Sequence, residues 1–320
     1  MRRMLILGGT GWLGRAIARR ALEEGAEVTC AARGLSGAVP EGARLAVIDR
    51  TVPDAHQKLE GDWDEVVELS YAPEVVLPAL EDLAHRAAHW SLISSVSVYR
   101  SNDEPGADES AELVDPVDLS QYPDAKVAAE QASRSRLGDR LLVIRPGLIV
   151  GPGDPSDRFG YWPARMARGG RMLAPTLANR FVQVIDVEDL ARFTVSAAAR
   201  GHFGEVNAVG EVLPFEEFLS LTAAAAQFDG TMVAADDETL LAHGVNYWSG
   251  PRSLPLWLPP AAAALMQRSG ARYSALGGTH TPLPEIIAMV LADERARGLR
   301  RARRSGLSAE DEQELLSTLS

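Results

Sequence analysis

Cysteine and long apolar runs are almost absent from this 320-residue sequence. Cys30 is its one cysteine, so no disulfide can form within the chain and nothing indicates an oxidising compartment. Cys30 stands in an apolar run and is expected to be a buried strand residue rather than a reactive thiol. No run approaches the roughly 18 to 20 apolar residues of a membrane helix, and the short run after Arg3 cannot form a signal-peptide core. We therefore expect a cytoplasmic protein without a membrane partner.

Positive charge and metal-ligand patterns are also scarce. Lys and Arg number 32 against 44 Asp and Glu, a net charge of -12 that repels nucleic acid. The arginines between 295 and 304 are flanked by acids at 293–294 and 310–314, which favours a solvated, ion-paired helix face over a phosphate-binding patch. Among six histidines, only His85 and His89 are four residues apart, without a Glu or Cys partner pattern. We expect no metal site.

The pattern that is present is an alternation of strands and helices. The apolar run Met4–Leu7 ends at glycines, Leu13–Glu24 has helical spacing, and Val28–Ala32 resembles a strand, which together make one βαβ unit. Further strand candidates are Arg44–Ile48, Glu65–Leu69, Ser91–Ser95 and Leu141–Ile144. This predicts an α/β protein with a doubly wound parallel Rossmann sheet and a smaller C-terminal substrate lobe.

Composition changes after residue 150, where loop residues, prolines and tryptophans become frequent. We predict a dinucleotide-binding domain over 1–150 and an interleaved substrate lobe over 151–320, with 181–200 returning to the first domain. In the lobe, Tyr247, Trp248 and Trp257 could line a pocket, but packing of the lobe's own core is favoured. Near the end, Ser308 to Asp311 is typical of a capping box for a helix that runs to about Leu319.

Three glycines follow the first strand and open the first helix. Gly8, Gly11 and Gly14 are spaced so that one makes a tight turn, one admits a pyrophosphate and one allows close helix packing. The amino terminus of the helix then offers N–H groups and a positive dipole end to phosphates. This pattern predicts a nicotinamide dinucleotide site.

The end of the second strand indicates which dinucleotide is bound. A carboxylate there would bind the ribose hydroxyls of NAD, but the run from Thr29 to Gly34 contains none. Arg33 offers a guanidinium fork for a 2′-phosphate, so NADP(H) is preferred and NAD(H) is the alternative. Arg33 could also be an ordinary solvated loop residue.

Tyr122 and Lys126 are four residues apart at the start of a helical segment, with Pro123 in its first turn. An ammonium beside a phenol lowers the pKa of the tyrosine, which suits proton transfer during carbonyl–alcohol interconversion. Alone, such a pair is commonplace. Ser94, Ser95 and Ser97, however, lie at the carboxyl end of the strand candidate Ser91–Ser95, the sheet edge where active sites of this fold class lie. A hydroxyl there could hold a developing oxyanion.

Over residues 4–225 the chain resembles the extended short-chain dehydrogenase/reductases, the NAD-dependent epimerase/dehydratase group. The motifs that carry the resemblance are Gly8–Gly14, Ile93–Tyr99, Tyr122–Glu130, Arg145–Gly147 with Gly151–Gly153, and Ile185–Ala191. The resemblance implies that Ser95 orients the substrate oxygen, Tyr122 is the acid/base and Lys126 also holds the nicotinamide ribose. It further implies that Asp49 approaches the adenine, and it suggests a homodimer. The residues expected to hold the cofactor are Gly8, Thr10, Gly11, Trp12, Leu13, Gly14, Arg33, Asp49 and Lys126.

Two departures from the family pattern narrow the function. The small-residue motif after the fourth strand is replaced by Glu68–Pro73, and Val96-Ser97 stands where sugar-nucleotide dehydratases have an Asp-Glu pair. The missing pair disfavours water elimination. From Arg33 and from the set of Ser95, Tyr122 and Lys126 we predict an NADP(H)-dependent oxidoreductase that interconverts a carbonyl and a secondary alcohol on a small molecule. The alternatives are an NAD-dependent sugar-nucleotide epimerase and a non-enzymatic nucleotide-sensing protein.

Overall fold

The computed structural model describes residues 1–318, which form two units. The first comprises Met1–Ile149, Val187–Gly210 and Arg268–His280. The second comprises Val150–Asp186, Glu211–Gln267 and the chain from Thr281 onward. The strand Phe181–Asp186 thus belongs to the second unit, whereas the helix that follows it belongs to the first.

A seven-stranded parallel sheet forms the centre of the first unit, in the order β10-β6-β5-β4-β1-β2-β3. Its strands are β1 (Arg3–Leu7), β2 (Glu27–Ala32), β3 (Arg44–Val47), β4 (Trp63–Glu68), β5 (Ala87–Ile93), β6 (Leu141–Pro146) and β10 (Gly204–Ala208). The chain winds outward from β1 to β3 and then from β4 in the opposite direction, so the order reverses between β1 and β4. Ligands of such sheets bind at the carboxyl ends of the strands beside this switch point. The predicted doubly wound Rossmann sheet is confirmed.

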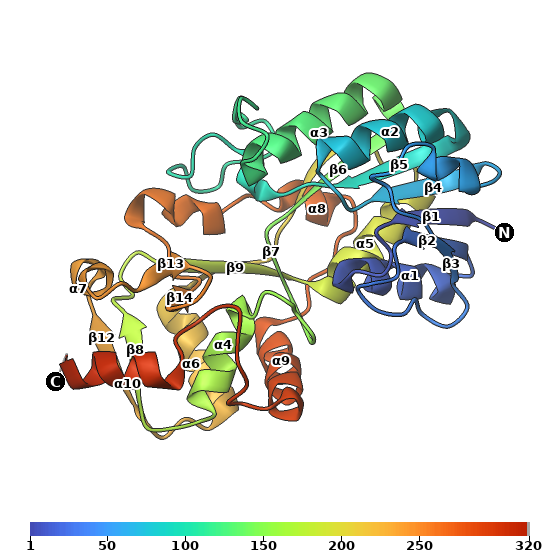
Figure 1. Ribbon diagram of the computed structural model, residues 1–320. Coiled ribbons are helices and arrows are strands. Elements are labelled where there is room, and N and C mark those ends of the chain that lie inside the picture. The colour runs from blue at the N-terminus through green and yellow to red at the C-terminus, as the bar shows by residue number, and fades with distance from the viewer. Residues whose placement is uncertain (319–320) are drawn as a thin grey trace. The chain divides into compact units, whose positions relative to one another are not determined.

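Helices cover both faces of this sheet. They are α1 (Trp12–Glu23), α2 (Pro73–Leu83), α3 (Tyr122–Leu137), α5 (Val187–Ala199) and the short α8 (Ala271–Ala275). Figure 1 shows α2 and α3 together on one face and α1 and α5 together on the other. The side of α1 that faces the sheet is made of small and branched apolar residues such as Ala16, Ile17 and Ala21, which lets the helix approach closely.

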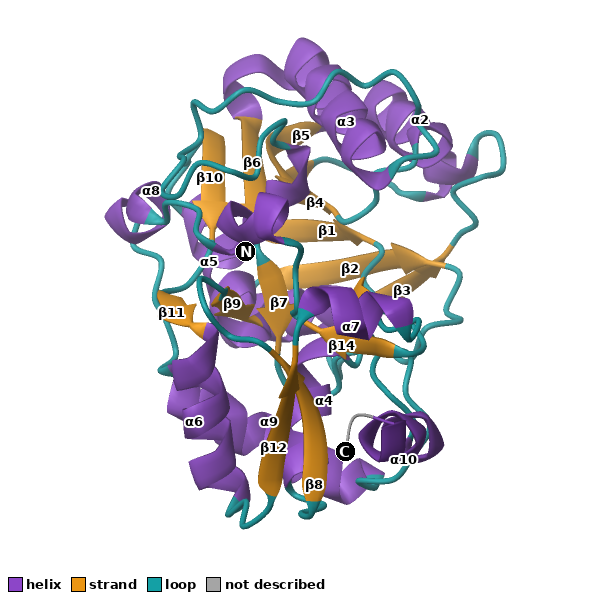
Figure 2. Ribbon diagram, turned by 90° about the vertical axis from the view of Figure 1, so that its left-hand side faces the viewer, coloured by secondary structure: helices purple, strands orange, loops and turns teal. Residues whose placement is uncertain are grey.

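The second unit combines short strand pairs with helices. Its strands are β8 (Arg171–Pro175), β9 (Phe181–Asp186), β11 (Val212–Pro214), β12 (Thr231–Ala235), β13 (Asn246–Trp248) and β14 (Ser253–Pro255), and β7 (Leu148–Val150) precedes them. Its helices are α4 (Arg158–Met166), α6 (Phe215–Ala226), α7 (Asp237–Ala242), α9 (Leu283–Arg297) and α10 (Ala309–Thr318). Figure 2 shows the parallel pair of β8 and β12. Trp257 is fully buried against Tyr247, which confirms the core-packing interpretation for Trp257.

One predicted strand boundary shifts, and the predicted start of the last helix is confirmed. The strand expected over Ser91–Ser95 begins earlier, because α2 ends at Leu83 and β5 already begins at Ala87. Ala87, His89 and Trp90 are buried and pair with residues of β4. This pairing makes residues 87–90 part of the strand. The last helix begins after Ser308, whose Oγ accepts the Asp311 N–H at 3.0 Å, as a helix cap should. Its expected end at Leu319 lies outside the described residues.

The carboxyl group of Glu65 is buried within the sheet. Glu65 of β4 is 1% exposed, and its Oε1 accepts the Ser91 hydroxyl of β5 at 3.0 Å. Burial raises the pKa of Glu65 from 4.5 to about 8. Between these two values the native protein keeps a proton that the unfolded chain has released, so the free energy of unfolding falls as pH rises from 4.5 to 8.

Glu65→Gln is therefore expected to remove this pH dependence. At pH 8.5 the variant should exceed the wild type in free energy of unfolding by at least about 2 kcal/mol, because an amide carries no charge to bury. At pH 4.5 the two proteins should be nearly equal. Denaturant unfolding at both pH values measures the difference, and Glu27→Gln, an exposed carboxyl on β2, is the control. A pH-independent difference between E65Q and wild type would contradict the assignment.

Candidate active site

The turn after β1 forms a cradle between strand and helix. Gly8 has a φ of +100°, a backbone conformation that favours glycine, and its carbonyl accepts the Gly11 N–H at 3.0 Å. Helix α1 then begins at Trp12, and its N-cap residue Gly11 gives no side-chain cap. Gly11 has no side chain that could cap the first turn of α1, which suits an anion site at the start of this helix.

The last glycine of the motif has a packing role. A Cβ at Gly14 would lie 2.6 Å from the Gly8 carbonyl oxygen and 2.8 Å from the Gly9 Cα, so any side chain would collide with the backbone. A Cβ at Gly11 would meet nothing closer than 3.4 Å. The cradle is thus packed against protein at Gly14 and open at Gly11. Thr10 is buried beneath it, and Trp12 and Leu13 are half-buried.

The ends of β2 and β3 place Arg33 and Asp49 near each other. Both side chains are exposed. Hydrogen bonds from the Thr51 hydroxyl and N–H lower the pKa of Asp49, and the nearby Arg33 guanidinium lowers it further. Arg15 of α1 donates to the carbonyls of Thr10 (2.6 Å) and Ser36 (2.9 Å), which ties the cradle to the loop after β2. Sequence reasoning did not single out Arg15.

Tyr122 and Lys126 occupy the first turns of α3. Lys126 is 4% exposed, and its Nζ donates to the Ile93 carbonyl at the end of β5 at 2.7 Å. The same Nζ lies 5.6 Å from the ring centroid of Tyr122. The expected pair of a phenol and an ammonium is therefore brought together, with the ammonium buried and the Tyr122 ring 42% exposed.

A second tyrosine stands beside this pair. Tyr71 lies in the loop between β4 and α2, and its ring centroid is 4.8 Å from the Lys126 Nζ. The rings of Tyr71 and Tyr122 meet edge to face, 4.9 Å apart at an interplanar angle of 82°. Tyr71 was not predicted as a site residue. The sequence did contain a signal for Tyr71, because a large aromatic residue stands there within Glu68–Pro73, where the family has small residues.

The Lys126 ammonium is placed between two carboxylates. Burial lowers the pKa of Lys126 from 10.5 to about 8, and the charges of Glu68 and Glu130 act in the opposite direction. Glu68 ends β4 and accepts a bidentate ion pair from Arg50, with one bond of 3.0 Å. Sequence reasoning missed Glu68 and Arg50 as a pair because they are 18 residues apart, one at the end of β4 and the other in the loop after β3.

Ser95 lies two residues after the end of β5 and caps a 3-10 turn over Val96–Val98. Its Oγ accepts the Ser97 N–H at 3.1 Å and donates to the Ser97 hydroxyl, also at 3.1 Å. The neighbouring Ser94 donates to Glu130 of α3. Ser95 thus lies two residues beyond Ile93, the residue whose carbonyl anchors Lys126.

A buried ion pair fixes α3 to the sheet. Arg145 of β6 donates to Glu130 from Nε (3.0 Å) and Nη2 (2.7 Å), and both side chains are at least 98% buried. Arg145 also donates to the Tyr99 hydroxyl at 3.0 Å, which in turn donates to Asn207 of β10 at 2.6 Å. These bonds hold the loop after β5 and the helix that carries Lys126 as one framework.

A profile of the NAD dependent epimerase/dehydratase family matches residues 4–210, about two thirds of the sequence. The chain belongs to the NAD-dependent epimerase/dehydratase family. Membership confirms the expected resemblance to the extended short-chain dehydrogenase/reductases and the expected class of NAD(P)-dependent enzyme. Within residues 1–318, no helix has the length and apolar character needed to cross a membrane.

Two curated proteins are similar to this epimerase/dehydratase family member over part of its length. A Synechocystis sp. protein provisionally assigned as a dihydroflavonol 4-reductase is 26% identical over 227 residues, 61% of this chain and 63% of the relative. A dTDP-6-deoxy-L-talose 4-dehydrogenase (NAD(P)(+)) of Kitasatospora kifunensis is 28% identical over 173 residues, 48% of this chain and 54% of the relative. Each match spans less than two thirds of the relative's length.

The fold is shared with a solved member of the family. UDP-glucuronic acid 4-epimerase from Bacillus cereus, determined in complex with NAD, superposes with a TM-score of 0.70 at 15% sequence identity. The superposition covers 92% of this chain and 99% of that one. At this identity the likeness shows the fold alone.

Proposed function

We propose that the protein is an NADP(H)-dependent oxidoreductase that interconverts a carbonyl and a secondary alcohol on a small-molecule substrate. The observation that carries the proposal is the half-exposed Tyr122 phenol beside the buried Lys126 ammonium, next to the strand end that bears Ser95. A phenol and a hydroxyl together can donate and accept protons on a substrate oxygen.

The residues of the first unit fit a nicotinamide dinucleotide. The open backbone at Gly11 and the start of α1, whose N-cap residue has no side chain, suit a pyrophosphate. Arg33 and Asp49 stand where the adenosine end would be held. When bound, the cofactor would supply the hydride acceptor or donor. In this proposal Lys126 also holds the nicotinamide ribose, and a homodimer remains a prediction.

The chain's own residues would handle the proton. Tyr122 would transfer a proton at its phenolic oxygen to or from the substrate oxygen, while the Ser95 hydroxyl holds that oxygen in place. Lys126 would stabilise the phenolate through its charge, since an ammonium in a buried setting acts on its neighbours more strongly than one in water. The Ile93 carbonyl fixes the position of the Lys126 Nζ.

An assay of hydride transfer tests the proposal. Purified protein should oxidise NADPH in the presence of at least one member of a panel of ketones and aldehydes. The panel includes sugar-nucleotide ketones, because one relative is named as a 4-dehydrogenase of a sugar nucleotide and such an oxidation yields a ketone. Protein that carries tightly bound NAD and consumes no NADPH would instead favour the sugar-nucleotide epimerase. NADPH binding that changes the oligomeric state without turnover would favour the sensing protein.

Arg33 is expected to set the cofactor preference. Arg33→Ala should raise the Kd for NADPH by at least about tenfold and change that for NADH by less than about twofold, because only NADPH offers a 2′-phosphate for a charge-assisted hydrogen bond. Fluorescence titration with each cofactor measures both constants. Arg136→Ala, which removes an exposed arginine of α3, is the control. An equal loss for both cofactors would show that Arg33 does not read the 2′-phosphate.

A further inference from the structure

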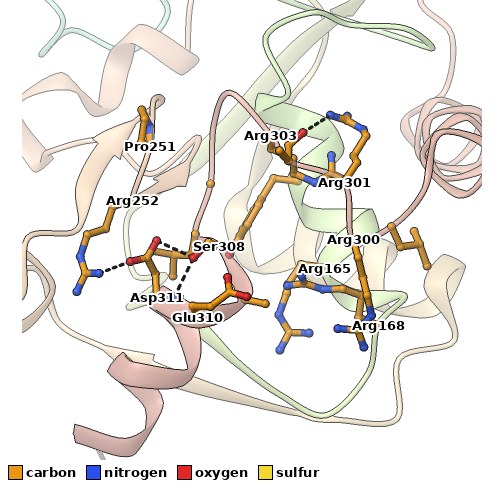
Figure 3. Close-up of a pocket in the computed structure, with 16 residues that line it drawn as sticks. Arg165, Arg168, Pro251, Arg252, Arg300, Arg301, Arg303, Ser308, Glu310 and Asp311 are labelled. Atoms are coloured by element: carbon orange, nitrogen blue, oxygen red, sulfur yellow. Dashed lines mark hydrogen bonds and ion pairs between the residues drawn. The ribbon is translucent and has the colours of Figure 1, made fainter.

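The second unit contains an arginine-rich cavity that the proposed function does not use. Its volume is about 440 Å³, and it lies between α4, the segment from Leu299 to Ser308, and the start of α10 (Figure 3). Six arginines line it against two carboxylates, Glu310 and Asp311, which gives the lining a net charge of +4. The chain as a whole has a net charge of -12, so the cavity is a positively charged region of a negatively charged protein.

Five of the six arginines form ion pairs within the unit, and in four of them the contact is 3.1 Å or shorter. Arg301 and Arg303 both bind Glu294, Arg252 binds Asp311, and Arg165 binds Glu312. The expected pairing of the basic stretch with acids is therefore confirmed for Arg301 and Arg303. These close ion pairs give the four arginines a structural role. They do not explain the position of the other two guanidinium groups.

The two remaining arginines are Arg168 and Arg300. Arg168 has one ion pair, a 3.5 Å contact with the Glu312 oxygen that Arg165 already binds. Arg300 is exposed and forms no ion pair with any carboxylate of residues 1–318. Figure 3 shows Arg165, Arg168 and Arg300 gathered at one end of the cavity, away from the pair of Arg252 and Asp311.

A second hollow of about 380 Å³ adjoins the first and shares the same three arginines. Three guanidiniums with a single carboxylate, Glu312, therefore separate two open spaces. Burial lowers the pKa of Arg168, and the charges of Arg165 and Arg300 lower it further, whereas Glu312 opposes them. The positive potential at this end of the cavity is thus only partly compensated by protein groups.

We propose that this cavity is a binding site for a small phosphorylated molecule, with Arg168 and Arg300 as the ligands of its phosphate group. Planar guanidinium forks bind phosphate in two-point hydrogen bonds, which a lysine ammonium does not. A volume of about 440 Å³ falls within the range of small-molecule sites, so there is room for an organic group beside the phosphate. The site is independent of the nucleotide cradle, because its residues all belong to the second unit.

Titration calorimetry of the full-length protein with inorganic pyrophosphate and with fructose 1,6-bisphosphate tests the proposal. Arg168→Gln/Arg300→Gln should weaken binding of both ligands at least about tenfold. The control Arg136→Gln/Arg295→Gln removes two exposed arginines, so the net charge changes equally outside the cavity. Arg300→Gln alone, at an exposed position without an ion pair, tests the site without loss of a structural contact. Tighter binding of the bisphosphate than of pyrophosphate would identify an organic phosphate as the ligand, whereas equal binding would identify the phosphate group alone.

Hydrogen exchange shows where on the protein the ligand binds. In the wild type, ligand should protect the backbone of α10 and of residues 299–308, and R168Q/R300Q should lose this protection. Pyrophosphate that binds only at the glycine cradle would give the same isotherm in all variants and protect the start of α1 instead. That result, or binding that falls equally in the control variant, would overturn the proposal.

Discussion

Tyr122→Phe is expected to lower kcat by about 10²- to 10⁴-fold and to leave the Kd for NADPH within about twofold. The change removes one hydroxyl, the group that would exchange a proton with the substrate oxygen, and a positioned acid or base contributes about this much to a rate. The ring, its edge-to-face contact with Tyr71 and its place near Lys126 remain. Steady-state kinetics on a substrate found in the carbonyl panel, together with cofactor titration, measure the two effects.

Tyr71→Phe is the matched control. Tyr71 loses the same hydroxyl, its ring lies 4.9 Å from that of Tyr122, and it is exposed to a similar degree, 38% against 42%. We expect Y71F to keep kcat within about threefold. If Y71F lost activity and Y122F kept it, the acid/base role would belong to Tyr71. If both variants kept full activity, neither phenol would transfer the proton.

Arg145→Met is expected to lower the free energy of unfolding by about 3–5 kcal/mol, because it leaves the buried Glu130 carboxylate without its partner. The melting temperature should fall by at least about 6 °C. Activity should fall as well, since Glu130 also binds Ser94 and faces the ammonium of Lys126. Thermal and denaturant unfolding measure the loss of stability.

A double variant separates loss of the pair from loss of packing. Glu130→Met/Arg145→Met should be more stable than either single variant, because no buried charge is then left unpaired. Arg134→Met, which breaks a surface pair with Glu205, is the control and should cost less than about 1 kcal/mol. A double variant as unstable as the sum of the single ones would show that the two charges act independently.

Local patterns made most of the sheet predictable. The glycine turn at Gly8 and the short apolar runs mark β1, β2, β3, β4 and β6 to within a few residues, because each run is bounded by residues that favour turns. The start of β5 was misplaced because Ala87 and His89 become part of a strand only through pairing with β4. The small strand pairs of the second unit gave no comparable pattern.

The candidate site was predictable where its residues share one element. Tyr122 and Lys126 are four residues apart on α3, so helical geometry alone brings them together. Glu68 approaches Lys126 from the end of β4 and Tyr71 from the loop that follows β4. Arg50 approaches Glu68 from the loop after β3. Their proximity depends on how the strands are ordered, which no spacing in the sequence encodes. The roles assigned to Ser95, Tyr122 and Lys126 remain predictions that the kinetic experiments decide.

The two ion pairs that flank Lys126 have a consequence for the direction of proton transfer. Arg50 cancels Glu68 and Arg145 cancels Glu130, so the protonated Lys126 leaves this buried cluster with one positive charge in excess. An ionised Tyr122 would bring the total to zero. In the proposed mechanism the cluster would therefore be electrically balanced once Tyr122 has given up its proton, which is the form of Tyr122 that accepts a proton when an alcohol is oxidised.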